Sequence, residues 1–204
     1  MVLEVAKSLR DELRKEGIEV ILTRSYDVFI PLARRAAIAN KKAADLFVSI
    51  HANASLTTSL KGFEVYYLSE ATDDTALALE RAENSVLHLE SAEWDAPSKD
   101  LKAIVWDMKE AENRKESLKL SRWITDSVEN FAGVSTHRIK AAQFYVLKWA
   151  ECPAVLVELG YLTHPLEEKK LNNPLYKQEL VRGIAKGLLE YKAEFEKTDG
   201  FTKE

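Results

Sequence analysis

The chain has 204 residues, of which 46% are hydrophobic and 30% are charged, and its formal net charge is -4. This length suits one well-buried domain and is short for two, and the acidic balance argues against nucleic acid as a dominant partner because phosphate binding needs a positive surface. The sequence holds one cysteine, which excludes an internal disulfide, and it shows neither a signal peptide nor a run of about 20 apolar residues that would cross a membrane.

In chain order, the predicted elements of the first third alternate between helix and strand. Residues 2–15 have an amphipathic pattern that ends near Gly17 and predicts a helix. Residues 18–23 predict a strand, and apolar residues between 29 and 40 predict a second helix. Residues 46–50 are continuously apolar, which is typical of a buried strand, and residues 62–68 alternate as in a further strand.

The rest of the chain continues the alternation. Residues 72–130 are highly charged, carry apolar residues at helical spacing and contain one clear breaker at residues 95–98. Residues 144–147 and 154–157 predict the last two strands, and Asn173 followed by Pro174 predicts the start of a closing helix. The fold class expected is α/β: a single domain with a mostly parallel twisted sheet and helices on both faces. Cys152, just before the last strand, is best interpreted as a small buried thiol.

Two of the predicted strands end in side chains that can perform chemistry. The apolar run 154–157 is followed by Glu158, and the run 46–50 is followed by His51. An ionised side chain on a strand covered on both faces needs a partner, and ligands of open parallel sheets bind at the carboxyl ends of the strands. Each residue alone is equally well explained as a capping or loop-anchoring group. Together they favour a reaction in one shared crevice.

These segments resemble the zinc-dependent N-acetylmuramoyl-L-alanine amidases that cleave peptidoglycan, often called the amidase 3 family. The resemblance spans nearly the whole chain and rests mainly on Ser-Ile-His-Ala-Asn around His51 and Val-Glu-Leu-Gly around Glu158. Supporting matches are Thr23-Arg24, Ala39-Asn40 and Gly62-Phe-Glu64-Val-Tyr. The resemblance implies that His51 is a ligand of Zn2+ and that Glu158 is the catalytic acid or base. Zinc would polarise the amide carbonyl and activate water, and the carboxylate would carry the proton.

The match to the family is incomplete at the start. Met1 aligns inside the family's first helix, so the family's first strand and two of its zinc ligands are expected to lie upstream of Met1. Glu4 falls about one turn inside that helix and does not replace the missing glutamate. His88, His137 and His164 match no family ligand; His137 is expected on the surface and His164 in a turn. Weak zinc binding and weak or absent activity are therefore expected of this chain.

Residues 72–113 resemble a helical insertion that a subgroup of these amidases carries over the active site. The matching residues are Glu83-Asn84-Ser85 and the segment 100–107. In that subgroup the insertion blocks the site and a partner protein relieves the block, so the resemblance implies an activator protein. An ordinary pair of charged surface helices explains the same pattern equally well. The resemblance also implies a muramoyl peptide of peptidoglycan as substrate and a periplasmic or extracellular location.

Two functions from different classes remain open. The first is a peptidoglycan amidase, and the second is a non-catalytic relative that binds the cell wall or a division partner without hydrolysis. The presence of both His51 and Glu158 speaks against the second, because a binding module has little use for a carboxylate at a buried strand end. A different metallohydrolase on a similar sheet is supported only by the alternation of elements.

Overall fold

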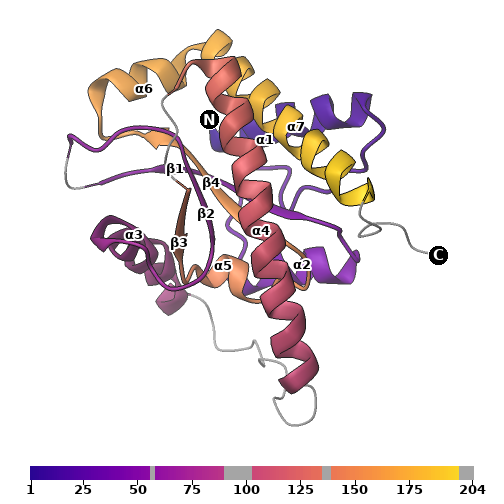
Figure 1. Ribbon diagram of the computed structural model, residues 1–204. Coiled ribbons are helices and arrows are strands. Elements are labelled where there is room, and N and C mark those ends of the chain that lie inside the picture. Colours follow the sequence, from indigo (N-terminus) through magenta and orange to yellow (C-terminus); the bar gives the residue numbers. More distant parts are fainter. Residues whose placement is uncertain (56–57, 90–102, 135–138, 198–204) are drawn as a thin grey trace.

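The computed structural model describes residues 1–55, 58–89, 103–134 and 139–197, and Figure 1 labels their helices and strands. The elements are α1 (Val2–Lys15), α2 (Leu32–Lys41), β1 (Phe47–Asn53), β2 (Glu64–Leu68), α3 (Asp74–Asn84), the short 3-10 helix η1 (Ser85–Leu89), α4 (Ala103–Ala132), β3 (Ile139–Ala142), α5 (Tyr145–Lys148), β4 (Ala154–Tyr161), α6 (Pro165–Asn172) and α7 (Pro174–Lys197). Among the described residues, no helix combines the length and the apolar composition needed to cross a membrane.

Within the described residues, the four strands form one sheet in the order β1-β4-β2-β3. The pairs β1 with β4 and β2 with β3 are parallel, and β2 with β4 is antiparallel. The predicted α/β domain with a mostly parallel sheet and helices on both faces is confirmed, and the central antiparallel pair is the feature that the sequence did not predict.

The larger core lies on the face of the sheet that α1, α4 and α7 cover (Figure 1). Side chains alternate along β4, so Val155, Val157 and Leu159 point to this face. The helices α4 and α7 pack closely, because a Cβ atom on Gly187 would lie 2.6 Å from the Cα atom of Ile124. The other contributors to this face are Val5, Leu9 and Leu13 of α1, Leu120, Ile124 and Val128 of α4, and Leu180, Val181, Ile184 and Leu188 of α7.

The opposite face of the sheet is covered by α2, α3 and α5, with a second apolar cluster beneath them. Ala154 and Leu156 of β4 and Tyr66 of β2 point to this face. Glu158, two residues after Leu156, and Glu64, two residues before Tyr66, point the same way. Leu32, Ala76, Leu79, Phe144 and Leu147 pack against them from the helices and the segment before α5. The functional residues described below lie on this second face.

Two predicted strands are wrong. Residues 18–23 form no strand in the described part of the chain: Ile18 and Val20 pack against the larger core, and the Val20 carbonyl accepts a hydrogen bond from Arg14 Nη2 at 3.1 Å. Ile18 and Val20 are partly buried and Ile21 is exposed, so the apolar pattern here reflects partial burial without a strand partner. Residues 144–147 begin the short helix α5, and Leu147 N donates to Phe144 O at 3.0 Å. A short apolar run is buried in either conformation, so its pattern does not distinguish them.

Other local predictions agree with the structure. The helix of residues 2–15 is α1, and Gly17 follows it with φ at 77°. Asn173 Oδ1 accepts a hydrogen bond from Leu175 N at 2.9 Å, with Pro174 as the first residue of α7. Cys152 is buried, and its burial raises the pKa of the thiol to about 12. The predicted breaker at residues 95–98 lies outside the described residues.

Candidate active site

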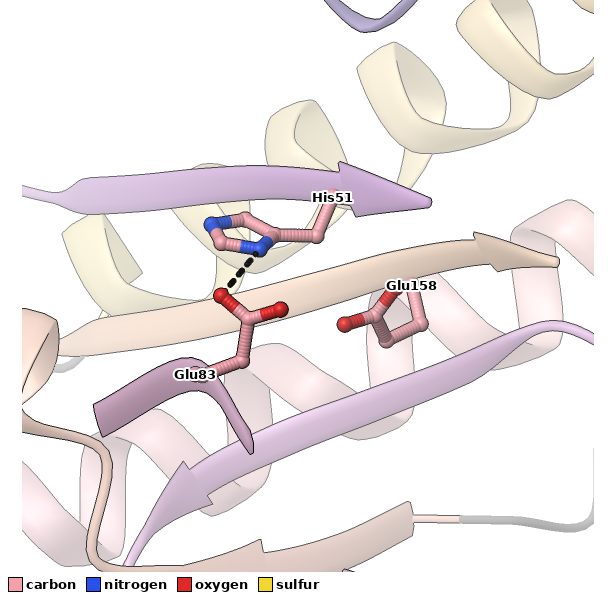
Figure 2. Close-up of side chains that lie close together, drawn as sticks. All are labelled: His51, Glu83 and Glu158. Atoms are coloured by element: carbon pink, nitrogen blue, oxygen red, sulfur yellow. Dashed lines mark ion pairs between the residues drawn. The ribbon is translucent and has the colours of Figure 1, made fainter. Parts of the chain in front are cut away.

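His51 and Glu158, the two strand-end residues, are brought together by the sheet. They are direct partners in the parallel register of β1 and β4, so their side chains leave the same face. Figure 2 shows both side chains in this arrangement, with that of Glu83 beside them. The side chain of His51 keeps 15% of its surface exposed, whereas Glu158 is fully buried. The arrangement places an imidazole with access to solvent next to a carboxyl group that has none.

The carboxyl group of Glu158 has no hydrogen-bond partner for either oxygen among the described residues. Burial raises the pKa of this carboxyl group well above its usual value, and the nearby carboxylates of Glu83 and Glu64 raise it further. A buried polar group without a partner costs free energy, and such groups in native proteins usually have a functional explanation. Glu158 is therefore suited to hold a proton to higher pH than an ordinary glutamate does.

The third residue of the cluster is Glu83, near the end of α3. Its Oε2 atom lies 3.0 Å from His51 Nδ1 (Figure 2). Burial alone would raise the pKa of the Glu83 carboxyl group, but the hydrogen bond and charge of His51 and the charge of Arg35 lower it overall. Glu83 is therefore an ionised carboxylate held against the imidazole.

The sequence singled out the segment at Glu83 only as part of a helical insertion and did not identify this residue as a site residue. Because α3 also carries Glu80 and Arg81, one more carboxylate on this helix is typical of a solvated face. The match of Glu83-Asn84-Ser85 to the subgroup with an inserted segment was the one signal that pointed to it.

The donor atoms of His51, Glu83 and Glu158 fit a metal ion. One ligand atom from each residue lies within 4.8 Å of the others. Zinc binds imidazole nitrogen and carboxylate oxygen, and catalytic zinc sites use three protein ligands and keep one position open. The two oxygens of Glu158 without partners add to this fit. The structure thus brings together two more potential donors than the sequence predicted for this chain, where His51 was the only one.

A second carboxylate lies on the other side of Glu158 in the sheet. Glu64 is the antiparallel register partner of Glu158, and it is fully buried. Its Oε2 atom accepts hydrogen bonds from the hydroxyl groups of Tyr66 at 2.7 Å and Tyr161 at 2.8 Å, and its Oε1 atom lies 3.2 Å from Lys140 Nζ. Glu64 is therefore a compensated buried charge.

Lys140 also connects Glu64 to the start of α3. Its Nζ atom lies 3.3 Å from Asp73 Oδ2 and donates to Thr75 Oγ1 at 2.6 Å. Asp73 is the N-cap of α3, since its side chain accepts a hydrogen bond from Ala76 N at 2.8 Å. The N-terminal end of α3, the helix that carries Glu83, is thus joined through Lys140 to Glu64. Local sequence patterns could not predict these partners, because they come from four separate elements.

The remaining residues that the sequence named lie away from the cluster or outside the description. Glu4 is exposed, and its Oε2 atom lies 2.7 Å from Lys177 Nζ. His164 caps α6, where its Nδ1 atom accepts a hydrogen bond from Leu166 N at 3.3 Å, so the predicted turn role is confirmed. His88 lies in η1, and its side chain is outside the described part of the chain, as is all of His137.

Comparison with known proteins identifies the family of this chain. A family model described as N-acetylmuramoyl-L-alanine amidase matches residues 1–190. The N-acetylmuramoyl-L-alanine amidase AmiA of Escherichia coli (strain K12) is 36% identical over 193 residues, which cover 94% of this chain and 67% of the relative. The crystal structure of an N-acetylmuramoyl-L-alanine amidase from Clostridium difficile 630 superposes with a TM-score of 0.68 at 28% identity, covering 94% of this chain and 81% of that chain.

A further solved structure shares the fold at lower identity. The CwlD amidase from Clostridioides difficile, solved in complex with the GerS lipoprotein, superposes with a TM-score of 0.69 at 22% identity, covering 94% of this chain and 84% of that chain. At this identity the similarity shows the fold alone.

Proposed function

The chain belongs to the N-acetylmuramoyl-L-alanine amidase family, and from this premise we propose that His51 and Glu158 act in its reaction and that Glu83 covers them. The reaction is hydrolysis of the amide bond between N-acetylmuramic acid and L-alanine in peptidoglycan. The observation that carries the proposal is Glu158, a buried carboxyl group without a hydrogen-bond partner among the described residues, placed in register with His51. Because the substrate is cell-wall material, the site of action is periplasmic or extracellular.

His51 binds the metal in this reaction, and Glu158 transfers the proton. His51 offers an imidazole nitrogen to Zn2+, which when bound supplies Lewis-acid chemistry that polarises the scissile carbonyl and makes water more acidic. Glu158 takes a proton from the attacking water as the new C–O bond forms. It then gives the proton to the amine as the C–N bond breaks. A raised pKa suits both steps, since the group must hold the proton between them.

Glu83, in contrast to the acid and base Glu158, occupies the position beside His51 that the substrate needs. A catalytic zinc site keeps one position open for water or substrate, whereas here the carboxylate of Glu83 lies 3.0 Å from His51 Nδ1. The conformation described is therefore a resting state, in which α3 covers the histidine. Glu83 has to withdraw before a muramoyl peptide can bind.

The contacts that α3 makes with the rest of the protein are of a kind that allows this helix to move away from His51. Its buried apolar residues are Ala76 and Leu79, and its remaining contacts are largely polar. Glu80 Oε2 accepts a hydrogen bond from Gln143 N at 2.7 Å, and Asn84 Nδ2 donates to Gln143 O at 2.9 Å. Polar contacts of this kind can be exchanged for contacts with water or with a partner at small net cost.

We extend the proposal to residues 72–113 as a helical insertion that covers the site and on which an activator protein acts. The position of Glu83 against His51 supports the covering role. The CwlD neighbour was solved as a complex with a lipoprotein, which gives a precedent for a protein partner on this fold. The alternative interpretation, a relative that binds the cell wall or a division partner without hydrolysis, predicts no product.

The reaction is tested by analysing the products from purified peptidoglycan with and without added zinc. Mass spectrometry should detect peptides with a free N-terminal L-alanine and glycan strands whose muramic acids have lost their peptides. Cleavage of glycosidic bonds or of peptide cross-links would contradict the proposed bond. Stable binding to peptidoglycan without any released peptide would support the non-catalytic alternative instead.

The covering role of α3 is tested with Glu83→Gln, which removes the charge that holds His51. The rate of peptide release by the protein alone should rise, because the position on the metal becomes available. Asp74→Asn is the matched control, since Asp74 is an exposed carboxylate on the same helix. If Glu83→Gln instead abolished both zinc binding and hydrolysis, Glu83 would be a required ligand and the covering role would be wrong.

A further inference from the structure

One carboxylate oxygen ties together the ends of the two strands that carry Glu64 and Glu158. Glu167 lies in the first turn of α6, and its Oε2 atom accepts hydrogen bonds from Gly62 N at 2.9 Å and from Tyr161 N at 3.0 Å. Gly62 precedes Glu64 by two residues, and Tyr161 follows Glu158 by three. The carboxylate therefore contacts the backbone close to both buried glutamates.

Beyond the last paired residues of β2 and β4, these two hydrogen bonds join the two chain segments through Glu167. The register of β2 and β4 runs from Tyr67 and Val155 to Glu64 and Glu158 and ends there. Beyond this pair, the amides of Gly62, two residues before Glu64, and of Tyr161, three residues after Glu158, both donate to Glu167 Oε2. Hydrogen bonds to an ionised acceptor are roughly twice as strong as those between neutral groups. The carboxylate thus closes the ladder next to the candidate catalytic residue.

The backbone at Gly160 is shaped for this contact. Gly160 has φ at +149°, a conformation that residues with side chains rarely adopt, and a Cβ atom there would lie 3.1 Å from Glu167 Oε2. The close approach of the carboxylate to the end of β4 therefore depends on a glycine between Glu158 and Tyr161.

The segment that follows β4 also binds the end of β1, which carries His51. Leu162 N donates to Asn53 O at 2.7 Å, and Ser55 N donates to Thr163 Oγ1 at 3.1 Å. The hydroxyl of Tyr161 holds Glu64 from the same segment. The turn between β4 and α6 is thus bonded to the chain at the ends of all three strands that supply His51, Glu64 and Glu158.

We propose that Glu167 is a positioning residue for the amidase reaction: by bonding the amides of Gly62 and Tyr161, it fixes the end of β4 so that Glu158 is held in register with His51. The inference rests on the proposed function of Glu158. Its physical basis is that a catalytic group displaced by about 1 Å can lose about 100-fold in rate. Without the carboxylate, the two amides lose their acceptor, and the segment before β2 and the end of β4 lose the group that joins them.

The experiment compares three variants of the full chain with the parent. Glu167→Ala removes the acceptor, whereas Glu167→Gln keeps a carbonyl oxygen that can accept the same two hydrogen bonds. Glu168→Ala is the matched control, because Glu168 is the neighbouring acidic residue of the same turn and is exposed. The measurements are kcat and KM on a soluble muramoyl peptide with zinc present, and hydrogen exchange of the individual backbone amides by NMR.

We expect Glu167→Ala to lower kcat by about 10- to 100-fold with KM nearly unchanged, since the change affects geometry at the reacting bond more than substrate binding. The amides of Gly62 and Tyr161 should exchange at least 10-fold faster, on the order of the loss of one hydrogen bond of about 1.4 kcal/mol. Exchange in α7 should not change. Glu167→Gln should retain both properties, and Glu168→Ala should match the parent.

Several results would overturn the inference. If the amides of Gly62 and Tyr161 exchange at the parent rate in Glu167→Ala, the inference is wrong, whether or not the activity changes. A Glu167→Gln variant as impaired as Glu167→Ala shows that the charge, not the two hydrogen bonds, matters. Faster exchange throughout β1 and α7 shows a general loss of stability. A parent that releases no peptide contradicts the proposed function separately, and the exchange data still decide whether Glu167 holds the end of β4.

Discussion

Glu64 and Glu158 lie directly opposite each other on β2 and β4, and of the two only Glu64 is matched by a lysine among the described residues. Lys140 and two tyrosine hydroxyl groups compensate the charge of Glu64, whereas Glu158 has no such partner there. Burial, together with the nearby carboxylates of Glu83 and Glu64, raises the pKa of Glu158 well above its ordinary value. Glu158 therefore keeps its proton to higher pH than an ordinary glutamate.

This difference predicts a pH-dependent stability in the metal-free protein. Burial raises the folded-state pKa of Glu158 above the ordinary value of 4.5, so the protonated group is tolerated at low pH and folding stability is lost as the pH rises through the range above 4.5. Glu158→Gln does not titrate and should be more stable than the parent at pH 8, by on the order of 1 kcal/mol for each unit of pKa shift.

Urea denaturation of both proteins at pH 4 and pH 8 with a chelator present measures the effect. The advantage of Glu158→Gln should be small at pH 4 and larger at pH 8. An advantage that shrinks as the pH rises would show that Glu158 is ionised and compensated in the folded state.

Activity should depend on the same residue. Glu158→Gln keeps the shape of the side chain and removes the proton acceptor, so the release of peptide from peptidoglycan should fall by roughly 10² to 10⁴. Zinc content should be retained. Glu151→Gln is the control, because Glu151 is an exposed carboxylate near the opposite end of β4. If Glu158→Gln hydrolysed peptidoglycan near the parent rate, the buried carboxyl group would have a structural role only.

His51 should be needed for the metal. His51→Ala removes the one nitrogen donor of the cluster, and we expect both bound zinc and hydrolysis to be lost. The control is His164→Asn, since asparagine preserves the cap of α6 and His164 lies outside the cluster. Metal analysis after dialysis distinguishes the two variants. Stoichiometric zinc in His51→Ala would place the metal elsewhere.

The contact between α4 and α7 predicts a reversal of the usual effect of glycine in a helix. Alanine normally stabilises a helix relative to glycine by about 1 kcal/mol. In Gly187→Ala the new Cβ atom would meet the Cα atom of Ile124 at 2.6 Å, so the free energy of unfolding should decrease by about 1–3 kcal/mol. Lys186→Ala, an exposed neighbour in α7, should stay within about 0.5 kcal/mol of the parent. A more stable Gly187→Ala would show that the two helices can separate without cost.

The sequence predicted the parts of the site that depend on local pattern. An apolar run that ends in one polar residue identifies a strand end, and two such ends located His51 and Glu158 before any contact was known. The structure places these residues in register. The same reasoning failed for residues 18–23 and 144–147, because apolar composition reports burial and not the pairing of a backbone with a neighbouring strand.

Contacts between distant segments could not be predicted in this way. Glu83 acquires its role only when α3 docks over β1, and nothing in a charged helical pattern distinguishes this residue from its solvated neighbours. Lys140 likewise becomes the partner of Glu64 through the pairing of β2 with β3. Such roles are determined by three-dimensional packing of elements that lie far apart in the chain.

The buried thiol of Cys152 gives the protein a built-in chemical reporter. It lies just before β4, at the end of the strand away from Glu158, and it is the one cysteine of the chain. With a pKa of about 12 almost none of it is thiolate near neutral pH, and only the thiolate attacks alkylating or disulfide reagents. Labelling therefore proceeds only through transient opening of this region. The rate at which a single mass increment appears therefore measures how readily this region opens, without any engineered probe.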